Sequence, residues 1–410
     1  MGRSICESGC ERLVPGGHSE NRHAREIAAG KNERRRDFGM KYPLEHMGPL
    51  HLFSWVVLFE LGSAVVIPIG MEAKQATWIV ILLGCLFGLV YMGAVYGTLY
   101  RMFPDIPLTG YARQIAGTVP GWLIGFAYLL YFVYIASRNT RDFGDLLAAA
   151  SYDSTPLSAL NLFMVVAVGY VIHFGLEVFG RTAFVFFLFT GAIFSFILLL
   201  VVFSDMSEYR RMLPILGDGW KPVWKALFPT NITFPFGELV VFTMLLPHMN
   251  KKFKAVRIGM GAMIASALLL CIATFVDISV LGVEIASRAT FPLFTSLSRL
   301  RLAEFVQRMD SVVLLLLVIT SFFKIGAFMF AAILAARDLF RTDNYKTLIM
   351  PVGIVVFCSS LVMAGSLTEH LEEGLKVVPL YVHLPFQFGL PAVLLLIAVL
   401  RGHRVRSASA

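Results

Sequence analysis

Charged residues are scarce in this sequence. Asp, Glu, Lys and Arg make up 15% of its 410 residues, whereas average globular chains carry roughly a quarter. Hydrophobic types make up 57%, and Phe alone occurs 35 times. So little charge argues against a soluble fold, and so much apolar side chain excludes disorder everywhere except at the two ends.

Paired cysteines and catalytic motifs are also missing. The five Cys residues, an odd number, exclude a disulfide framework, and Cys85, Cys271 and Cys358 lie in apolar runs as expected of small core residues. Cys6 and Cys10, in a polar stretch, are only a weak metal signal. The sequence contains no Walker loop, GxSxG elbow or HExxH motif. We therefore expect no enzymatic activity, no cofactor and no metal site.

Long apolar runs are what the sequence has instead. A transmembrane helix needs about 20 mostly apolar residues. We therefore predict an all-α integral membrane protein with about ten transmembrane spans, of which the sixth is short. The predicted spans are residues 49–70, 77–100, 120–147, 156–174, 183–204, 233–248, 257–282, 309–336, 347–365 and 384–400.

The basic residues set the predicted orientation. The formal net charge is +8, and placing the N-terminus inside puts most of the 35 Lys and Arg residues on the inner side. Cytoplasmic loops of membrane proteins carry such an excess, so both termini are predicted to be cytoplasmic. We interpret the excess as orientation and contact with lipid headgroups, not as a nucleic-acid site.

Three regions are predicted along the chain. Residues 1–46 are polar, and they lack the apolar run of a signal peptide. We expect a disordered cytoplasmic tail there, or alternatively a true translation start at Met40. Residues 47–400 form the predicted transmembrane domain, and residues 401–410 form a basic cytoplasmic tail.

Spans one and six are interrupted in a similar way. Glu60, Gly62 and Ser63 break the apolar run of span one, and span six places Gly237 beside Glu238 with a Pro near each end. Gly permits unusual backbone conformations and Pro removes a backbone donor, so both loosen a helix. The sequence therefore predicts a local break in each of these spans.

The positions of the two breaks suggest a binding site. Spans one and six each begin a half of five spans, and interrupted spans at corresponding places indicate a transporter-like site. A half-helix N-terminus offers N–H donors to a carboxylate, while unwound carbonyls face a cation, as an amino-acid zwitterion requires. The alternative is that Gly62 and Gly237 merely allow close helix packing.

Three ionisable residues, Glu60, Glu238 and Lys324, lie inside predicted spans. Each costs from about 2.5 kcal/mol upward at a helix centre, so each is expected to point inward and to be paired. Thr320 lies one turn before Lys324 on the same face of span eight. Facing the break in span one, Lys324 is predicted to act as a fixed cation or a titrating group. The alternative is a structural Lys–Glu pair with no role in gating.

Span three carries a face of tyrosines and a charged end. Tyr128, Tyr131 and Tyr134 recur every three residues, and they are predicted either to close over a small ligand or to pack against helices. Further along, Arg138 is predicted to pair with Asp142, and Arg141 with Asp145, as structural i,i+4 pairs.

Short strings along the chain match one known family in order and spacing. They are 59–63 (FELGS), 76–78 (ATW), 141–145 (RDFGD), 155–156 (TP), 175–177 (GLE) with Arg181, 214–215 (PI), 234–238 (FPFGE), 281–282 (LG), 291–292 (FP), 307–310 (QRMD) and Lys324. Through them the chain resembles, over about residues 45–400, the spore germination receptor B-subunit family. That family belongs to the amino acid–polyamine–organocation transporter superfamily.

The resemblance implies a fold, a function and partners. The fold is a five-plus-five inverted repeat with a ligand pocket between spans one, three, six and eight. The function is nutrient sensing in the inner membrane of a bacterial endospore, where a germinant, often an amino acid, binds. The partners are an A subunit and a lipoprotein C subunit. Carried onto this sequence, the pocket includes Gly62, Ser63, Phe236 and Gly237, with Lys324 where related transporters place a cation.

The residues and the resemblance together give one set of predicted site residues. The expected ligand is a small nutrient; the mostly apolar lining by Phe236, Val240 and Tyr131 suggests a small apolar amino acid, and a nucleoside or a sugar stays open as an alternative. A proton-coupled amino-acid transporter and a structural scaffold for partner subunits stay open as alternatives. The predicted ligand-binding residues are Gly62, Ser63, Tyr131, Tyr134, Phe236, Gly237 and Thr320, and the predicted coupling charges are Glu60, Glu238 and Lys324.

Overall fold

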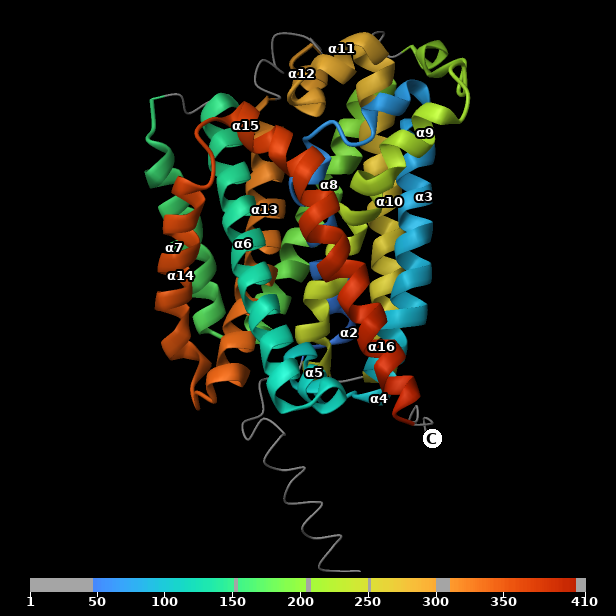
Figure 1. Cartoon of the computed structure of the whole chain (residues 1–410). Helices are drawn as coiled ribbons and strands as arrows, with labels where there is room; N and C mark the ends of the chain where they lie inside the picture. The colour runs from blue at the N-terminus through green and yellow to red at the C-terminus, as the bar shows by residue number, and fades with distance from the viewer. Residues whose placement is uncertain (1–46, 151–153, 204–207, 250–251, 300–309, 403–410) are drawn as a thin grey trace, which may run out of the picture. The chain divides into compact units, whose positions relative to one another are not determined.

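The structure, a computed structural model, describes residues 47–150, 154–203, 208–249, 252–299 and 310–402 (Figure 1). These residues are helical almost throughout, and the one β-type pairing among them is an isolated bridge between Met47 and Met249. The predictions for residues 1–46, including Cys6, Cys10 and the start at Met40, lie outside the described residues. So do residues 403–410 of the basic tail and most of the 307–310 string.

The apolar runs form helices where the sequence places the spans. In the described part of the chain, seven helices are long and apolar enough to cross a membrane, and two apolar helices are shorter. All nine coincide with predicted spans, which confirms an all-α membrane fold. The total of ten spans and the inverted repeat stay predictions. The long helices are Met71–Met102, Thr118–Ala150, Leu176–Phe203, Lys254–Leu281, Ser311–Phe340, Tyr345–Val362 and Pro379–Leu400, and the shorter ones are Pro49–Val65 and Leu157–His173.

The α-helices run side by side, with short helices at both ends of the bundle (Figure 1). α9, α11, α12 and α15 lie at one end, and α4 and α5 lie at the other. The bounds are α2 Pro49–Leu61, α3 Thr77–Tyr91, α4 Gly97–Met102, α5 Leu108–Ala116, α6 Thr118–Ala150, α7 Leu157–His173, α8 Leu176–Phe203, α9 Lys221–Ala226, α10 Lys252–Leu281, α11 Val283–Arg288, α12 Pro292–Arg299, α13 Asp310–Phe340, α14 Ile349–Val362, α15 Leu367–Glu372 and α16 Leu390–Leu400.

α13 is the central helix. Residues 323–337 are buried on every face, as expected of a helix that is apolar all round. α13 packs most extensively against α6 and also contacts α2 and α7. Its central position brings Thr320 and Lys324 within reach of several other spans.

Four predicted spans depart from regular α-helix, and one of them is span two, which contains a π-helical turn over Met92–Tyr96. Span one ends as α-helix at Leu61 and continues as a 3₁₀ turn over Gly62–Val65, and span six is a 3₁₀ helix over Phe236–Met244. These are the two breaks that the sequence predicts. Span ten was not predicted to be irregular, yet it begins as a π-helix over Pro379–Gly389, which follows another over Glu373–Val377. π-Helices are rare and concentrate at functional sites.

Three tyrosine hydroxyls bind the backbone of the π-helix in span ten. Tyr128 on α6 donates to the carbonyl of Phe386 at 2.8 Å. Tyr91 and Tyr96, from the span that contains α3, donate to the carbonyls of Phe388 and Gln387. Carbonyl groups that a widened helix leaves exposed must be satisfied by other groups in a membrane. The phenols supply those partners.

α5 and the start of α6 form a helical hairpin at the end of the bundle away from α11, α12 and α15 (Figure 1). Arg113 on α5 forms an ion pair of 2.5 Å with Asp338 near the end of α13. Gly121 on α6 lies so close to α5 that a Cβ there would overlap the backbone of Arg113. The hairpin therefore depends on the missing side chain.

We predict that Gly121→Ala destabilises the protein by about 1–3 kcal/mol, the usual cost of overpacking, because the neighbouring backbone cannot move aside cheaply. Gly191→Ala on α8 is the matched control, since a Cβ there meets no atom within 4 Å. Thermal unfolding in detergent should show a lower midpoint for the Gly121 variant alone. Equal midpoints for the two variants would contradict this account.

Candidate functional site

The break in span one is held open by a left-handed glycine. Gly62 has φ 35° and ψ −133°, a conformation that residues with a Cβ rarely adopt. A Cβ at this position would also overlap the side chain of Lys324. Thr320 on α13 donates a hydrogen bond of 2.8 Å to the carbonyl of Gly62. The Gly, the Thr and the Lys that the sequence singles out therefore meet at one point.

Lys324 links this break to span six. Its Nζ lies 2.5 Å from Oε2 of Glu238, and the two side chains are 0% and 2% exposed. The ammonium also lies over the ring of Phe234, 4.2 Å from the centroid, and 5.5 Å from that of Phe59. The predicted Lys–Glu pair is therefore present, with the cation held between two aromatic faces.

Glu60 has a different environment. Its side chain is fully buried, and neither carboxylate oxygen has a hydrogen-bond partner among the described residues. The expectation that all three membrane charges are paired therefore holds for Lys324 and Glu238 but not for Glu60. An unpaired carboxyl group inside a membrane span is costly and marks a candidate functional group.

The other predicted residues of spans one and six divide between the break and its surroundings. Ser63 lines a cavity beside the break, and its hydroxyl has no partner among the described residues. Phe236 is buried against α3, where Cβ atoms on Gly84 or Gly88 would meet its side chain. Gly237 lies against the side chain of Gln387 in span ten. Phe234, rather than Phe236, contributes the aromatic ring to the cavity.

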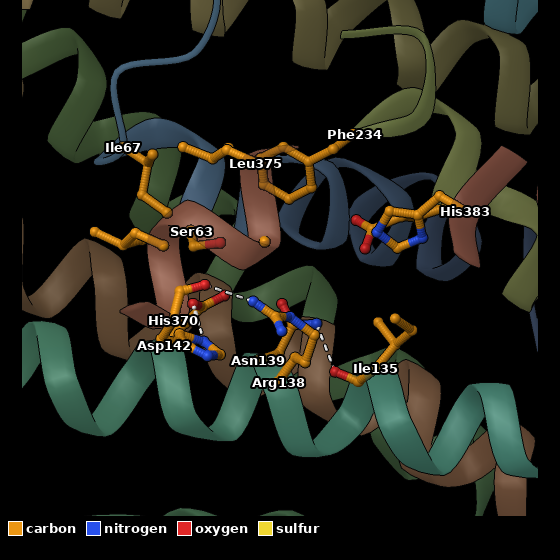
Figure 2. Close-up of a pocket in the computed structure, with 13 residues that line it drawn as sticks. Ser63, Ile67, Ile135, Arg138, Asn139, Asp142, Phe234, His370, Leu375 and His383 are labelled. Carbon is orange, nitrogen blue, oxygen red and sulfur yellow. Dashed lines mark hydrogen bonds and ion pairs between the residues drawn. The ribbon is translucent and has the colours of Figure 1, made fainter. Parts of the chain in front are cut away.

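The cavity beside the break has a volume of about 50 Å³ (Figure 2). Four parts of the chain line it: the end of span one, the middle of α6, the start of span six, and the stretch from α15 into span ten. Both signs of charge and several hydroxyl, amide and imidazole groups face it. The lining residues are Ser63, Ile67, Ile135, Arg138, Asn139, Asp142, Phe234, Glu238, His370, Leu371, Gly374, Leu375 and His383.

Two tyrosines of α6 contact residues that line the cavity or lie next to it. Tyr131 is 3.0 Å from Nδ1 of His383 and accepts a hydrogen bond of 3.0 Å from Gln387. Tyr134 accepts a hydrogen bond of 3.2 Å from Arg138. Both hydroxyls bind protein groups in this structure.

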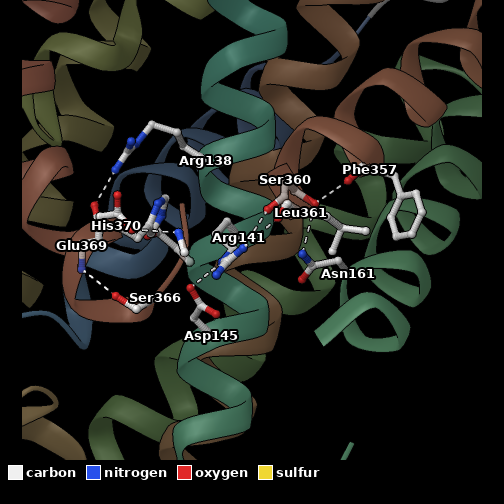
Figure 3. Close-up of polar contacts among 12 residues, drawn as sticks. Arg138, Arg141, Asp145, Asn161, Phe357, Ser360, Leu361, Ser366, Glu369 and His370 are labelled. Carbon is white, nitrogen blue, oxygen red and sulfur yellow. Dashed lines mark hydrogen bonds and ion pairs between the residues drawn. The ribbon is translucent and has the colours of Figure 1, made fainter. Parts of the chain in front are cut away.

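The charged end of α6 pairs differently from the i,i+4 prediction. Arg141 does pair with Asp145, at 2.6 Å, and it also reaches the carbonyls of Ser360 and Leu361 (Figure 3). Arg138 pairs instead with Glu373 at 3.1 Å. Asp142, predicted as its partner, binds Nε2 of His370 at 2.8 Å. Long-range partners replace the local one because the segment after α14 returns over α6.

The stretch from α15 into span ten is a part of the site that sequence reasoning missed. His370, Gly374 and His383 line the cavity, and Gln387 lies just behind it. A signal was available, since His383 and Gln387 are polar residues inside an otherwise apolar run that also contains Pro385. Polar residues and Pro inside a span indicate an interrupted helix lining a cavity.

We predict that Lys324→Met destabilises the protein by about 3–5 kcal/mol, because Glu238 is left buried without its cation. The double variant Lys324→Met with Glu238→Gln removes both charges and should recover most of this loss. Thermal unfolding in detergent measures both. A single variant as stable as the wild type would show that the ion pair contributes nothing to folding.

Comparison with known proteins is consistent with this geometry. The family described as spore germination protein matches residues 46–366. Spore germination protein KB of Bacillus subtilis is 36% identical over 356 residues, covering 86% of this chain and 94% of that protein. Spore germination protein A2 of the same organism is 25% identical over 313 residues, covering 73% and 82%. Spore germination protein YndE is 24% identical over 285 residues, covering 68% and 77%.

The match extends over the broken spans, the ion pair and most of the cavity lining. It covers well over half of the chain, and protein KB is matched along nearly its whole length. The chain therefore belongs to the spore germination protein family, the germination receptor B-subunit family that its sequence strings indicate.

Proposed function

We propose that this protein is the germinant-sensing subunit of a spore germination receptor. It binds a small nutrient, an amino acid by preference, in the cavity beside the break in span one. Binding changes the contacts of the broken spans, and partner subunits respond to that change. The observation that best supports this proposal is the buried ion pair between Lys324 and Glu238 at the edge of a polar cavity.

The lining of the cavity supports a small polar ligand. Binding sites for small molecules combine apolar walls with a few placed polar groups, and here Ile67, Ile135 and Phe234 stand beside Ser63 and Asn139. Charged groups inside a membrane protein mark sites for ligands or ions.

The surroundings of the protein are part of the proposal. We place it in the inner membrane of the spore with both termini cytoplasmic, in a complex with an A subunit and a lipoprotein C subunit. Exposed apolar side chains along α8, among them Phe189, Leu199 and Phe203, suit contact with lipid. In this arrangement the protein receives the nutrient, and the complex carries the response.

One observation favours a second function. Glu60 is fully buried and its carboxyl group is unpaired among the described residues, so it is a candidate to carry a proton. A proton-coupled amino-acid transporter would use such a group. The alternative differs from the sensor in one measurable way: it accumulates its ligand.

We predict that Gly62→Leu abolishes the ligand response and leaves membrane insertion intact. A side chain there overlaps Lys324 and cannot adopt the positive φ without strain. Gly191→Leu on α8, which faces open space, is the control and should respond normally. Germination of spores that carry each variant gives the readout. A normal response from the Gly62 variant would place the ligand elsewhere.

Binding and uptake in proteoliposomes separate the two functions. A labelled panel of amino acids, sugars and nucleosides is offered with and without a proton gradient. Saturation near one ligand per protein, whatever the gradient, is the result expected of a sensor. Accumulation many-fold above the protein content, abolished by an ionophore, would establish the transporter instead.

A further inference from the structure

Arg138 holds a segment that lines one side of the cavity. The segment comprises α15, Leu367–Glu372, and the π-helical turn Glu373–Val377. The guanidinium donates to the carbonyl of His370 at 2.7 Å and to the carboxylate of Glu373 at 3.1 Å. Gly374 permits this approach, since a Cβ there would lie 2.5 Å from a guanidinium nitrogen. Asp142, one turn along α6, binds His370 in the same segment.

The two partners in this ion pair have unequal surroundings. The Arg138 side chain is 8% exposed and lines the cavity, whereas the Glu373 side chain is 41% exposed. Their contact runs between one guanidinium nitrogen and one carboxylate oxygen. Paired, fork-like contacts between Arg and a carboxylate are stronger than single ones. Another anion can therefore replace Glu373, whereas the nearly buried Arg138 stays in the cavity wall.

Charge decides what could replace Glu373. A guanidinium stays charged at every physiological pH, and Arg138 is stabilised by an anion beside it. A neutral solute cannot take over the role of the carboxylate. A solute carboxylate can, because it keeps Arg138 paired while the released Glu373 side chain reaches water.

We infer that Glu373 occupies the carboxylate position of the cavity, and that a ligand carboxylate displaces it from Arg138 and loosens the segment 367–377. This inference rests on the proposed function and narrows its ligand class to small solutes that carry a carboxylate. Arg138 is the recognition residue, and Glu373 is an internal competitor. Displacement also removes one of the contacts by which α6 holds this segment against the cavity.

The test measures binding to the full chain in lipid nanodiscs. The probes are L-alanine, L-alaninamide, which lacks the carboxylate, and the neutral solutes glucose and inosine. Glu373→Gln removes the competing charge at a partly exposed position, so it is expected to tighten L-alanine binding about fivefold, the scale of a partly exposed ion pair. L-Alaninamide binding should not change. Arg138→Gln should weaken L-alanine binding by about tenfold or more.

The neighbouring residue supplies the matched control. Glu372 pairs with Lys376 in the same segment, and their side chains are 61% and 71% exposed, respectively. Glu372→Gln removes the same charge without touching Arg138, so L-alanine affinity should stay at the wild-type value. An equal effect of the two substitutions would attribute the change to net charge and overturn the inference.

Hydrogen exchange gives a second reading with a simpler probe. Sodium acetate, compared with sodium chloride at equal ionic strength, should speed amide exchange in residues 367–377 of the wild type but not of Arg138→Gln. Unchanged exchange together with no carboxylate-dependent binding overturns the inference. If glucose or inosine then binds in the cavity, the proposed sensor function holds and only the displacement inference fails. If no probe binds at all, the sensor function and the displacement inference are both wrong.

Discussion

The ion pair between Lys324 and Glu238 is the contact on which the broken spans depend. Both charges lie in the apolar interior, where either one alone is costly. Lys324 comes from the central helix α13, and Glu238 from the 3₁₀ helix of span six. Moving either element away from the other separates the charges. The pair therefore fixes where span six lies against α13, and Thr320 on the same helix face fixes the end of α2.

α6 meets its neighbours through two unlike interfaces. Along α13 it makes apolar contacts that depend on close packing. Toward α14 and span ten it offers four charged residues within eight positions, and their partners are Glu373, His370 and the carbonyls of Ser360 and Leu361. Packing contacts are lost when a gap opens, whereas hydrogen bonds and ion pairs can pass from one partner to another. The polar side of α6 is thus the side on which partners can change.

The spans and both breaks could be predicted because their causes are local. Twenty apolar residues in a row indicate a membrane helix wherever they occur, and a break in span one is expected where Glu60, Gly62 and Ser63 interrupt such a run. The meeting of Gly62, Thr320 and Lys324 was predictable only through the family resemblance, because 258 positions separate Thr320 from Gly62.

The rest of the site depends on chain segments that only the fold brings together. Arg138 has an acidic residue at i+4, and local spacing favours that partner. The fold instead brings Glu373, 235 positions away, to the guanidinium. The direction of Phe236 was likewise not encoded locally, because the break in span six decides which of Phe234 and Phe236 faces the cavity.

The phenols that bind span ten impose a further constraint on how that span can move. Tyr91 and Tyr96 belong to one membrane span and Tyr128 to another, and their three acceptor carbonyls are consecutive in the chain. A rotation by one residue would break all three hydrogen bonds together, and each carbonyl left bare in hydrocarbon costs several kcal/mol. The three hydrogen bonds therefore fix both the rotation and the height of span ten against the two spans that carry the tyrosines.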